Sequence, residues 1–492
     1  MTKTIRNICF FVIALLPVIS CDDYVDQNPE YTLDADNFFK SPGDYDRALT
    51  GAYDLMQTSY LSLWIGDIAS DNSIAGGESV TDTEGLHQID AMTHGGTNNE
   101  LRNIWRWMYA GITRVNYIFE FKDNIEFTGK DKILAQAAFL RAYYYFELVK
   151  FFGDVPLIVD RRINLGEVAK QARVPKAEVY AQIEEDLRFA AATLDWTAEK
   201  KGRITKGAAL SLLGKAYLYQ NKFNDAATVL DQVINQKTYS LFDDITTLFL
   251  FDNEDNSEVV FDIQYVGIEG GGYDCFVCLE GNAAVGFNGI RGYSGPEFSD
   301  GNSYNLPTQD LVDEFEPNDP RLQASVFDIE AYIASQPASA KISYIEGGGG
   351  HTGYYNNKYL KRLAELGAGD TDLTSPLNHK VIRYADVLLM AAEAHNRKPS
   401  PNDGLARQYL NEVRDRVDMT HVSASGSALT EAIYHERRVE FAGEGQRFFD
   451  LVRTGKAADQ IPGFKTGKHE VFPIPQVEID LAGAGWTQNN GY

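Results

Sequence analysis

The sequence predicts a mainly α-helical protein with tetratricopeptide-like helix pairs, long irregular loops and minor β-structure. Apolar side chains recur every three or four residues through several long segments, which is the period of an amphipathic helix. Residues 204–237 have the small and large apolar residues of one tetratricopeptide unit, and 381–417 form a looser second copy. Strand-like alternation is clearest at 259–266. These three observations define the expected fold class.

The first twenty residues predict an export signal. Lys3 and Arg6 precede a twelve-residue apolar stretch, 8–19, which is too short to span a bilayer. Residues 18–21, Val-Ile-Ser-Cys, then resemble a bacterial lipobox. We expect residues 1–20 to be removed, Cys21 to be lipidated and anchored to a membrane, and residues 21–35 to form a tether. The alternative is an ordinary signal peptide followed by a chance Cys.

The mature chain is expected to form one domain, 36–492. Helices are predicted at 36–56, 101–121, 131–152, 175–194 and in both repeat copies. Gly214 and Ala226 are small and would let the helices of the first repeat approach closely. Residues 65–95, rich in Gly, Asp and Ser, predict a loop. We divide the domain into a helical part (36–250), a loop-rich ligand-facing part (251–380) and a second helical part (381–492).

Charge excludes some partners. The chain has 492 residues, 45 Lys plus Arg and 70 Asp plus Glu, giving a net charge of −25. A chain this acidic repels phosphate backbones, so we expect no nucleic-acid partner. No 18-residue apolar run follows the first 20 positions, which argues against a polytopic membrane protein.

Motifs for cofactors and metals are incomplete. Gly348, Gly350 and Gly353 match a dinucleotide pattern, but no apolar helix follows them. Cys275 and Cys278 form a lone C-x-x-C, for which we expect a local disulfide or two loop thiols. Four carboxylates lie close together in the sequence and suggest either a calcium site or a solvated acidic loop: Asp252, Glu254, Asp255 and Glu258. We expect no cofactor, no metal and no catalytic residue.

Residues 436–451 alternate Arg and carboxylates beside Phe and Leu. Charged residues at this density could form a catalytic site. We prefer a structural interpretation, in which the paired charges dock a C-terminal helix on the core.

The chain resembles the SusD/RagB family, the nutrient-binding outer-membrane lipoproteins of Bacteroidota. The resemblance covers nearly the whole mature chain and depends on the following segments: the lipobox at Cys21, 48–53, 109–116, 138–146, 153–156, 320–321, 383–389, 436–455 and 472–492. Asn490 departs from the family pattern, in which Pro is common.

The resemblance implies a non-catalytic surface lipoprotein that binds a nutrient, for which we prefer an oligosaccharide, and that acts as the lid of a SusC-like TonB-dependent barrel. Aromatic residues from two loops, here 66–98 and 265–305, would form the ligand site. The first stretch has no Trp. We therefore predict a polar site with one or two stacking rings, built from Asp71, Asn72, His87, Asn98, Tyr273, Phe276 and Tyr293. A peptide or another nutrient as ligand, and a surface glycoside hydrolase, are the alternatives.

Overall fold

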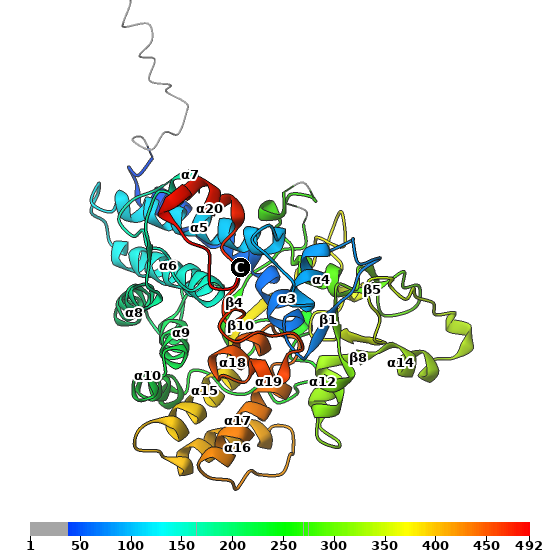
Figure 1. The fold of residues 1–492 in the computed structure, drawn as a ribbon. Helices are drawn as coiled ribbons and strands as arrows, with labels where there is room; N and C mark the ends of the chain where they lie inside the picture. Colours follow the sequence, from blue (N-terminus) through cyan, green and yellow to red (C-terminus); the bar gives the residue numbers. More distant parts are fainter. Residues whose placement is uncertain (1–37, 164, 269, 274) are drawn as a thin grey trace, which may run out of the picture.

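Long helices form one side of the molecule, and short strands and loops form the other (Figure 1). The computed structural model describes residues 38–163, 165–268, 270–273 and 275–492. The predicted signal peptide, Cys21 and the tether lie outside these residues. No helix in the described part is long and apolar enough to cross a bilayer.

The first half of the chain is almost entirely helical. Its helices are α2 (Pro42–Asp54), η2 (Leu55–Ser59), α3 (Tyr60–Ile68), α4 (Glu84–Asp90), α5 (Asn99–Glu120), α6 (Lys130–Phe152), α7 (Leu165–Val168), α8 (Lys176–Thr193), α9 (Lys206–Tyr219) and α10 (Phe223–Gln236). At the N-termini of two of the long helices, a side chain accepts hydrogen bonds from backbone amides that have no partner within the helix. Asn98 caps α5, and Thr205 caps α9.

The second half mixes short and long helices. They are η3 (Phe251–Asn253), η4 (Phe276–Cys278), α11 (Ala283–Asn288), α12 (Gln309–Glu314), α13 (Pro320–Ser325), α14 (Ile329–Ser335), η5 (Ala338–Ala340), η6 (Leu363–Glu365), α15 (Tyr384–Arg397), α16 (Asp403–Asp415), α17 (Ser427–Glu440), α18 (Arg447–Arg453), α19 (Ala457–Gln460), α20 (Gln476–Ala482) and η7 (Gly483–Gly485). The mainly helical fold class with minor β-structure is confirmed.

The predicted repeat pairs form one continuous array. In it α6 packs on α8, α8 on α9, α9 on α10, α10 on α15 and α15 on α16. Residues 237–383 separate α10 from α15 in sequence, so the two repeat copies join only in space. A Cβ placed on Gly214 would lie 2.6 Å from the Leu230 side chain, which confirms that a small residue is needed between α9 and α10.

The strands are short and pair in twos. The antiparallel pairs are β1 (Ser73–Ala75) with β7 (Asn305–Pro307), β2 (Val155–Pro156) with β3 (Arg173–Val174), β4 (Val259–Ile263) with β10 (His379–Arg383), and β8 (Val326–Asp328) with β9 (Tyr354–Asn356). The pair β5 (Ile290–Arg291) and β6 (Asp300–Gly301) is parallel. The predicted strand at 259–266 is therefore real, and it ends at Ile263.

The prediction of a loop at 65–95 was wrong in part. Helix α3 continues to Ile68, β1 follows, and α4 occupies Glu84–Asp90. Every residue of α3 is buried, so the helix has no polar face and gives no amphipathic period. Helix α4 has only seven residues, too few for a periodic signal.

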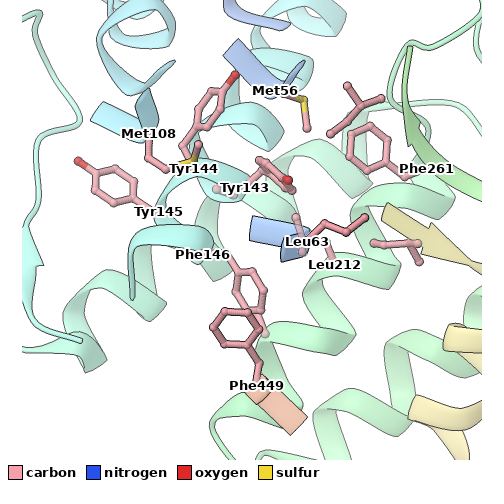
Figure 2. Close-up of a cluster of buried hydrophobic side chains, with 14 of the residues drawn as sticks. Met56, Leu63, Met108, Tyr143, Tyr144, Tyr145, Phe146, Leu212, Phe261 and Phe449 are labelled. Atoms are coloured by element: carbon pink, nitrogen blue, oxygen red, sulfur yellow. The ribbon is translucent and has the colours of Figure 1, made fainter. Parts of the chain in front are cut away.

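The largest core cluster lies where the two helical parts meet. Figure 2 shows side chains of α3, α5, α6, α9, β4 and α18 converging, among them Tyr143 and Phe146 of α6, Leu212 of α9 and Phe449 of α18. The ring of Phe146 packs edge-on against Tyr219 at 5.0 Å between centroids. The C-terminal helices are thus part of the same core as α6.

Buried ion pairs hold α17 and the following turn against β10, which confirms the structural interpretation of residues 436–451. The Arg383 guanidinium lies 2.7 Å from Glu444 Oε1 and 3.0 Å from Glu440 Oε1. Arg416 lies 2.6 Å from the other oxygen of Glu440. Burial alone would raise the pKa of Glu440, but the surrounding guanidiniums of Arg416, Arg383 and Arg321 outweigh it and lower that pKa.

The cluster of carboxylates at 252–258 is a solvated acidic loop only in part, because Asp252 and Asp255 are exposed whereas Glu254 is partly buried. Glu258 is fully buried between Arg383 and Arg416, and the Glu254 carboxylate lies 3.4 Å from Lys380 Nζ. Asp255 pairs with Lys201. The sequence could not show this, because all four cationic partners are distant in the chain.

Candidate functional site

The two stretches predicted to form the ligand face do meet. Strand β1 pairs with β7, and the pairing continues outward through Gly76 N, which donates to Tyr304 O at 3.1 Å. Helix α4 supports this junction from behind. Its His87 Nε2 lies 2.9 Å from Gly76 O, and Asp90 accepts from Ala75 N at 2.9 Å. In Figure 1, β1, α4 and β5 lie together beside α3, away from the helical array.

A third segment covers this junction. Gly348 N donates to Glu78 O at 2.9 Å, and Gly349 N donates to Gly77 O at 3.2 Å. A Cβ on Gly349 would lie 2.3 Å from Gly76 O, so glycine is required for the close approach of two backbones. The G-x-G-x-x-G pattern at 348–353 therefore has a packing role here.

Aromatic rings from three elements form a continuous row, which begins in the core and ends at the surface. Centroids are 5.0 Å apart between Trp64 and Phe287, 5.6 Å between Phe287 and Tyr304, and 6.2 Å between Phe287 and Phe276. Tyr273 packs edge-on against Phe276 at 6.1 Å and is 51% exposed. We call Tyr273, Phe276 and Tyr304 the tyrosine surface; buried Phe287 and Trp64 lie beneath it.

Charged side chains surround the two tyrosine hydroxyls. Partial burial and, next, the Asp82 carboxylate raise the pKa of Tyr304 to about 12, although Arg291 opposes the shift. Partial burial and the carboxylates of Asp372 and Asp370 raise the pKa of Tyr273. Both phenols are thus protonated at neutral pH and remain hydrogen-bond donors.

A disulfide closes the loop that carries two of these rings. Cys275 and Cys278 are bonded, which decides between the two alternatives left by the sequence. Phe276 lies inside the four-residue ring, and Tyr273 lies two residues before it. The cross-link restricts the conformations of this loop before any ligand binds.

Asp71 and Asn72 are engaged by arginines. Arg447 binds both oxygens of Asp71, at 2.8 and 2.7 Å, and Arg438 Nε donates to Asn72 Oδ1 at 3.0 Å. Both residues are tied into the contacts of α17 and α18. The structure therefore gives them partners within the protein and does not place them beside Tyr273.

Asn98, His87 and Tyr293 also have internal partners. Asn98 caps α5 and donates to Gly85 O and Gln88 Oε1. His87 supports Gly76, as described above. Tyr293 is 6% exposed, donates to Pro296 O at 2.6 Å and belongs to a second core cluster with Phe298. Of the seven predicted ligand residues, only Tyr273 and Phe276 share the tyrosine surface.

Sequence reasoning did not single out Tyr304 and Trp64 as site residues. Tyr304 lies among several aromatic residues of a Gly-rich stretch, and no local pattern separates it from Tyr293. Trp64 stands just before the first expected loop stretch, and it is buried beneath the tyrosine surface, where it packs against Phe287. If α3 had been recognised as a helix, its period would have placed Trp64 on the same face as Tyr60, against which it packs.

Other possible sites differ in kind from this surface. A cavity of 660 Å³ lies between the start of α2, the start of α6 and the 194–204 loop. Its charged side chains are already ion-paired, as in Lys132 with Asp195 and Arg203 with Asp46. Within the described part of the chain, no group of three or more His, Cys, Asp or Glu could hold a metal ion.

Comparison with known proteins identifies the family. Residues 235–470 match a model described as the SusD family, and residues 23–218 match one described as starch-binding and associating with the outer membrane. A solved laminarin-binding SusD-like protein is 33% identical, with a TM-score of 0.83, and the match covers 92% of this chain and all of that one. The chain belongs to the SusD family.

Other SusD relatives agree over the same length. SusD-like protein P2 of Formosa agariphila is 27% identical over 98% of this chain and 99% of its own length. Surface glycan-binding protein A of Bacteroides thetaiotaomicron, solved in complex with laminarihexaose, is 25% identical with a TM-score of 0.81 and covers 91% of this chain and 99% of that one. SusD membership, the helical fold class and the long loops predicted from sequence are therefore consistent with each other.

Proposed function

We propose that this SusD-family chain is a non-catalytic, lipid-anchored surface protein that binds an oligosaccharide at the tyrosine surface and acts as the lid of a SusC-like TonB-dependent barrel. The observation that carries the proposal is the half-exposed ring of Tyr273, held by a disulfide loop at the junction of β1 and β7. Sugar faces carry C–H groups that pack on aromatic rings, and sugar hydroxyls need nearby donors and acceptors.

The relatives support a glycan as ligand. One is named for laminarin binding, and another was solved with laminarihexaose. Laminarihexaose is therefore the first ligand to test. Lipidation at Cys21 would keep the protein at the outer membrane, and the helical array would supply a surface for the barrel.

Calorimetry of residues 22–492 with laminarihexaose tests the binding site. Tyr273→Ala should weaken binding about tenfold to a hundredfold, because truncating a stacking ring removes about 1.4–3 kcal/mol. Phe189→Ala is the matched control: Phe189 is 40% exposed on α8, far from the site, and its variant should bind like the wild type. Equal affinity of Tyr273→Ala and wild type would remove the site assignment.

Two further measurements separate the alternatives. Mass spectrometry of the incubated hexaose should show no shorter product; a product would indicate the glycoside hydrolase. A peptide digest in the same calorimeter should give no heat, and heat from peptides alone would indicate the peptide-binding alternative. Co-purification of a TonB-dependent barrel with the lipidated chain tests the lid role, and its failure from native outer membranes would argue against that role.

A further inference from the structure

We infer that residues 464–492 form a latch on the loop that follows α4, residues 91–98, and that two neutral imidazoles, those of His94 and His469, hold this latch closed until acid opens it. The contact between the two segments involves no ligand. It can therefore be tested without reference to the proposed sugar binding.

The two imidazoles lie inside the contact between the loop and the C-terminal segment. Their ring centroids are 5.4 Å apart, and the two side chains are only 2% and 1% exposed. Phe472 of the segment packs on the His94 ring at 5.0 Å. The backbone joins the same two segments, because Gln476 N donates to Gly96 O at 2.7 Å. The latch is thus a buried interface whose centre is titratable.

Hydrogen bonds fix which nitrogens of the two rings carry protons. The Tyr492 hydroxyl donates to Val471 O at 3.2 Å, so it accepts from His94 Nε2, which lies 2.9 Å away. Lys465 N donates to His469 Nδ1 at 3.0 Å, so the proton of neutral His469 is on Nε2. The other two ring nitrogens, His94 Nδ1 and His469 Nε2, are buried and have no partner among the described residues. A proton added to His469 would also take the lone pair that accepts from Lys465 N.

The surroundings of the pair disfavour positive charge. The groups that face the two rings come from the C-terminal segment and from the end of α4: Lys465, Lys468, Glu470, Tyr492 and the Gln88 carbonyl. The Lys468 ammonium lies 4.3 Å from the centroid of the Tyr492 ring. Among the described residues, neither imidazole has a carboxylate partner of the kind that Asp231 provides to His395. A positive charge on either ring would be both desolvated and repelled.

The direction of the pH effect follows from this environment. Burial and then the charges of His469 and Lys468 lower the pKa of His94 to about 3, although the Gln88 carbonyl opposes the shift. Burial also lowers the pKa of His469. In an opened latch both rings are solvated and have the ordinary pKa of about 6.5. Closing is therefore fully favoured above pH 6.5 and progressively less favoured as the pH falls toward 3.

The latch loop also braces the strand that carries the candidate site. Thr93 N and His94 N both donate to Gln88 O near the end of α4, at 2.9 and 3.1 Å. Helix α4 in turn supports Gly76 and Ala75 of the β1 segment through two of its side chains. Opening of the latch should therefore remove one support from α4 and β1.

Hydrogen exchange of residues 22–492 at pH 7.5 and pH 5, corrected for intrinsic exchange rates, tests the latch. The key variant is His94→Gln with His469→Asn. The Gln amide can still donate to Tyr492, and the Asn oxygen can still accept from Lys465 N, so both hydrogen bonds are kept while both titrations are removed. His421→Gln is the matched control, because the His421 side chain is 61% exposed beyond the end of α16.

In the wild type, the amides of His94, His469 and Gln476 should lose about 30-fold in protection between pH 7.5 and pH 5 through His94 alone. The control variant should behave in the same way, and the key variant should show no such loss. A third variant, Tyr492→Phe, keeps both imidazoles and removes only the hydroxyl contact. It should lower protection at both pH values and keep the pH dependence.

The outcomes are distinct. A loss of protection at pH 5 in the wild type and in His421→Gln, absent from the key variant, supports the latch. An equal loss in the wild type and the key variant, or none in the wild type, overturns it. If the key variant does not fold, Tyr492→Phe decides: retained pH dependence supports the latch, and protection that does not change with pH overturns it. None of these results depends on whether laminarihexaose binds.

Discussion

Asp67 is a buried carboxylate whose removal should stabilise the protein at neutral pH. Its buried oxygens accept from Gly445 N at 3.0 Å and from Asn305 Nδ2 at 3.2 Å, and among the described residues no ion pair is formed with it. Burial raises its pKa from 3.8 to about 7, although these two hydrogen bonds oppose the shift. Asp67 therefore links α3, the site strand β7 and the turn after α17 at a cost in stability.

The direction in which stability changes with pH follows from the number of protons that each state binds at Asp67. Between pH 3.8 and pH 7 the folded state binds more protons at Asp67 than the unfolded state, so the free energy of unfolding falls as pH rises through this window. A shift of about three pKa units corresponds to about 4 kcal/mol, fully lost above pH 7, as an upper limit.

Asp67→Asn removes this cost. The amide oxygen of Asn can accept from Gly445 N, and its NH2 group can donate to Asn305 Oδ1, which is buried without a partner, once the Asn305 amide turns over. We expect the variant to be about 2–4 kcal/mol more stable than wild type at pH 8 and nearly equal to it at pH 4. For a chain of this length, that is a rise in melting temperature of about 2–4 °C.

Calorimetric unfolding of variant and wild type from about pH 2 to pH 8 measures the difference in their free energies of unfolding, in which the contributions of all other titrating groups cancel. Asp450→Asn is the matched control with the opposite sign. Burial would raise the pKa of Asp450, but Arg437 and Arg453 outweigh it and lower that pKa. This control should be destabilised at pH 7 and recover toward wild type only as pH falls below 4. An Asp67→Asn variant that is less stable than wild type at pH 8, or a difference that stays constant with pH, would refute the reasoning.

Three further predictions concern the loop, the repeat and the ion pairs. Replacing Cys275 and Cys278 by Ser should weaken laminarihexaose binding about threefold to tenfold through loss of preorganisation, with little change in melting temperature; reduction of the wild type with dithiothreitol should give the same loss, and unchanged calorimetric affinity after both treatments would contradict this role. Gly214→Ala should destabilise by about 1–3 kcal/mol in denaturant titration because of its contact with Leu230. Gly404→Ala is the control and should be neutral or stabilising, because Gly404 is exposed in the first turn of α16 and a Cβ there meets nothing closer than 3.5 Å. Glu440→Gln should lose about 3–5 kcal/mol, because Arg383 and Arg416 then share fewer buried carboxylates and carry uncompensated positive charge. Stability equal to that of wild type would show that these pairs do not hold α17.

The long helices could be predicted from sequence because their signal is local. Helices α5, α6 and α8 begin and end within two residues of the predicted bounds. Helices α5 and α8 are partly exposed and therefore alternate apolar and polar faces, whereas α6 is mostly buried and its end is marked by Gly153. Helix α3 was missed for the opposite reason: all its residues are buried, so both faces look alike. The structural role of 436–451 was also predictable, because Arg and carboxylates at that density beside apolar residues satisfy one another.

The site was only half predictable. Gly-rich aromatic loops indicated which stretches form it, and those two stretches do meet at β1 and β7. Which side chain faces solvent was not predictable. Tyr273 and Tyr293 look equivalent in sequence, yet one is 51% exposed and the other 6%. Polar residues such as Asp71 and Asn98 looked available as ligands because their partners, Arg447 and the amides of α5, are not visible as partners in a linear pattern.

The sequence by itself determined the helical fold class, the repeat pairs, the acidic character, the expected export signal and the resemblance to SusD proteins, because each depends on composition or on spacing within one segment. The tertiary structure decided which rings form a surface, which carboxylates remain beside it and which arginines neutralise the others. Those properties depend on contacts between segments up to several hundred residues apart, as between Asp71 and Arg447. Exposure and charge balance are sums over such contacts, so they exist only once the chain has folded.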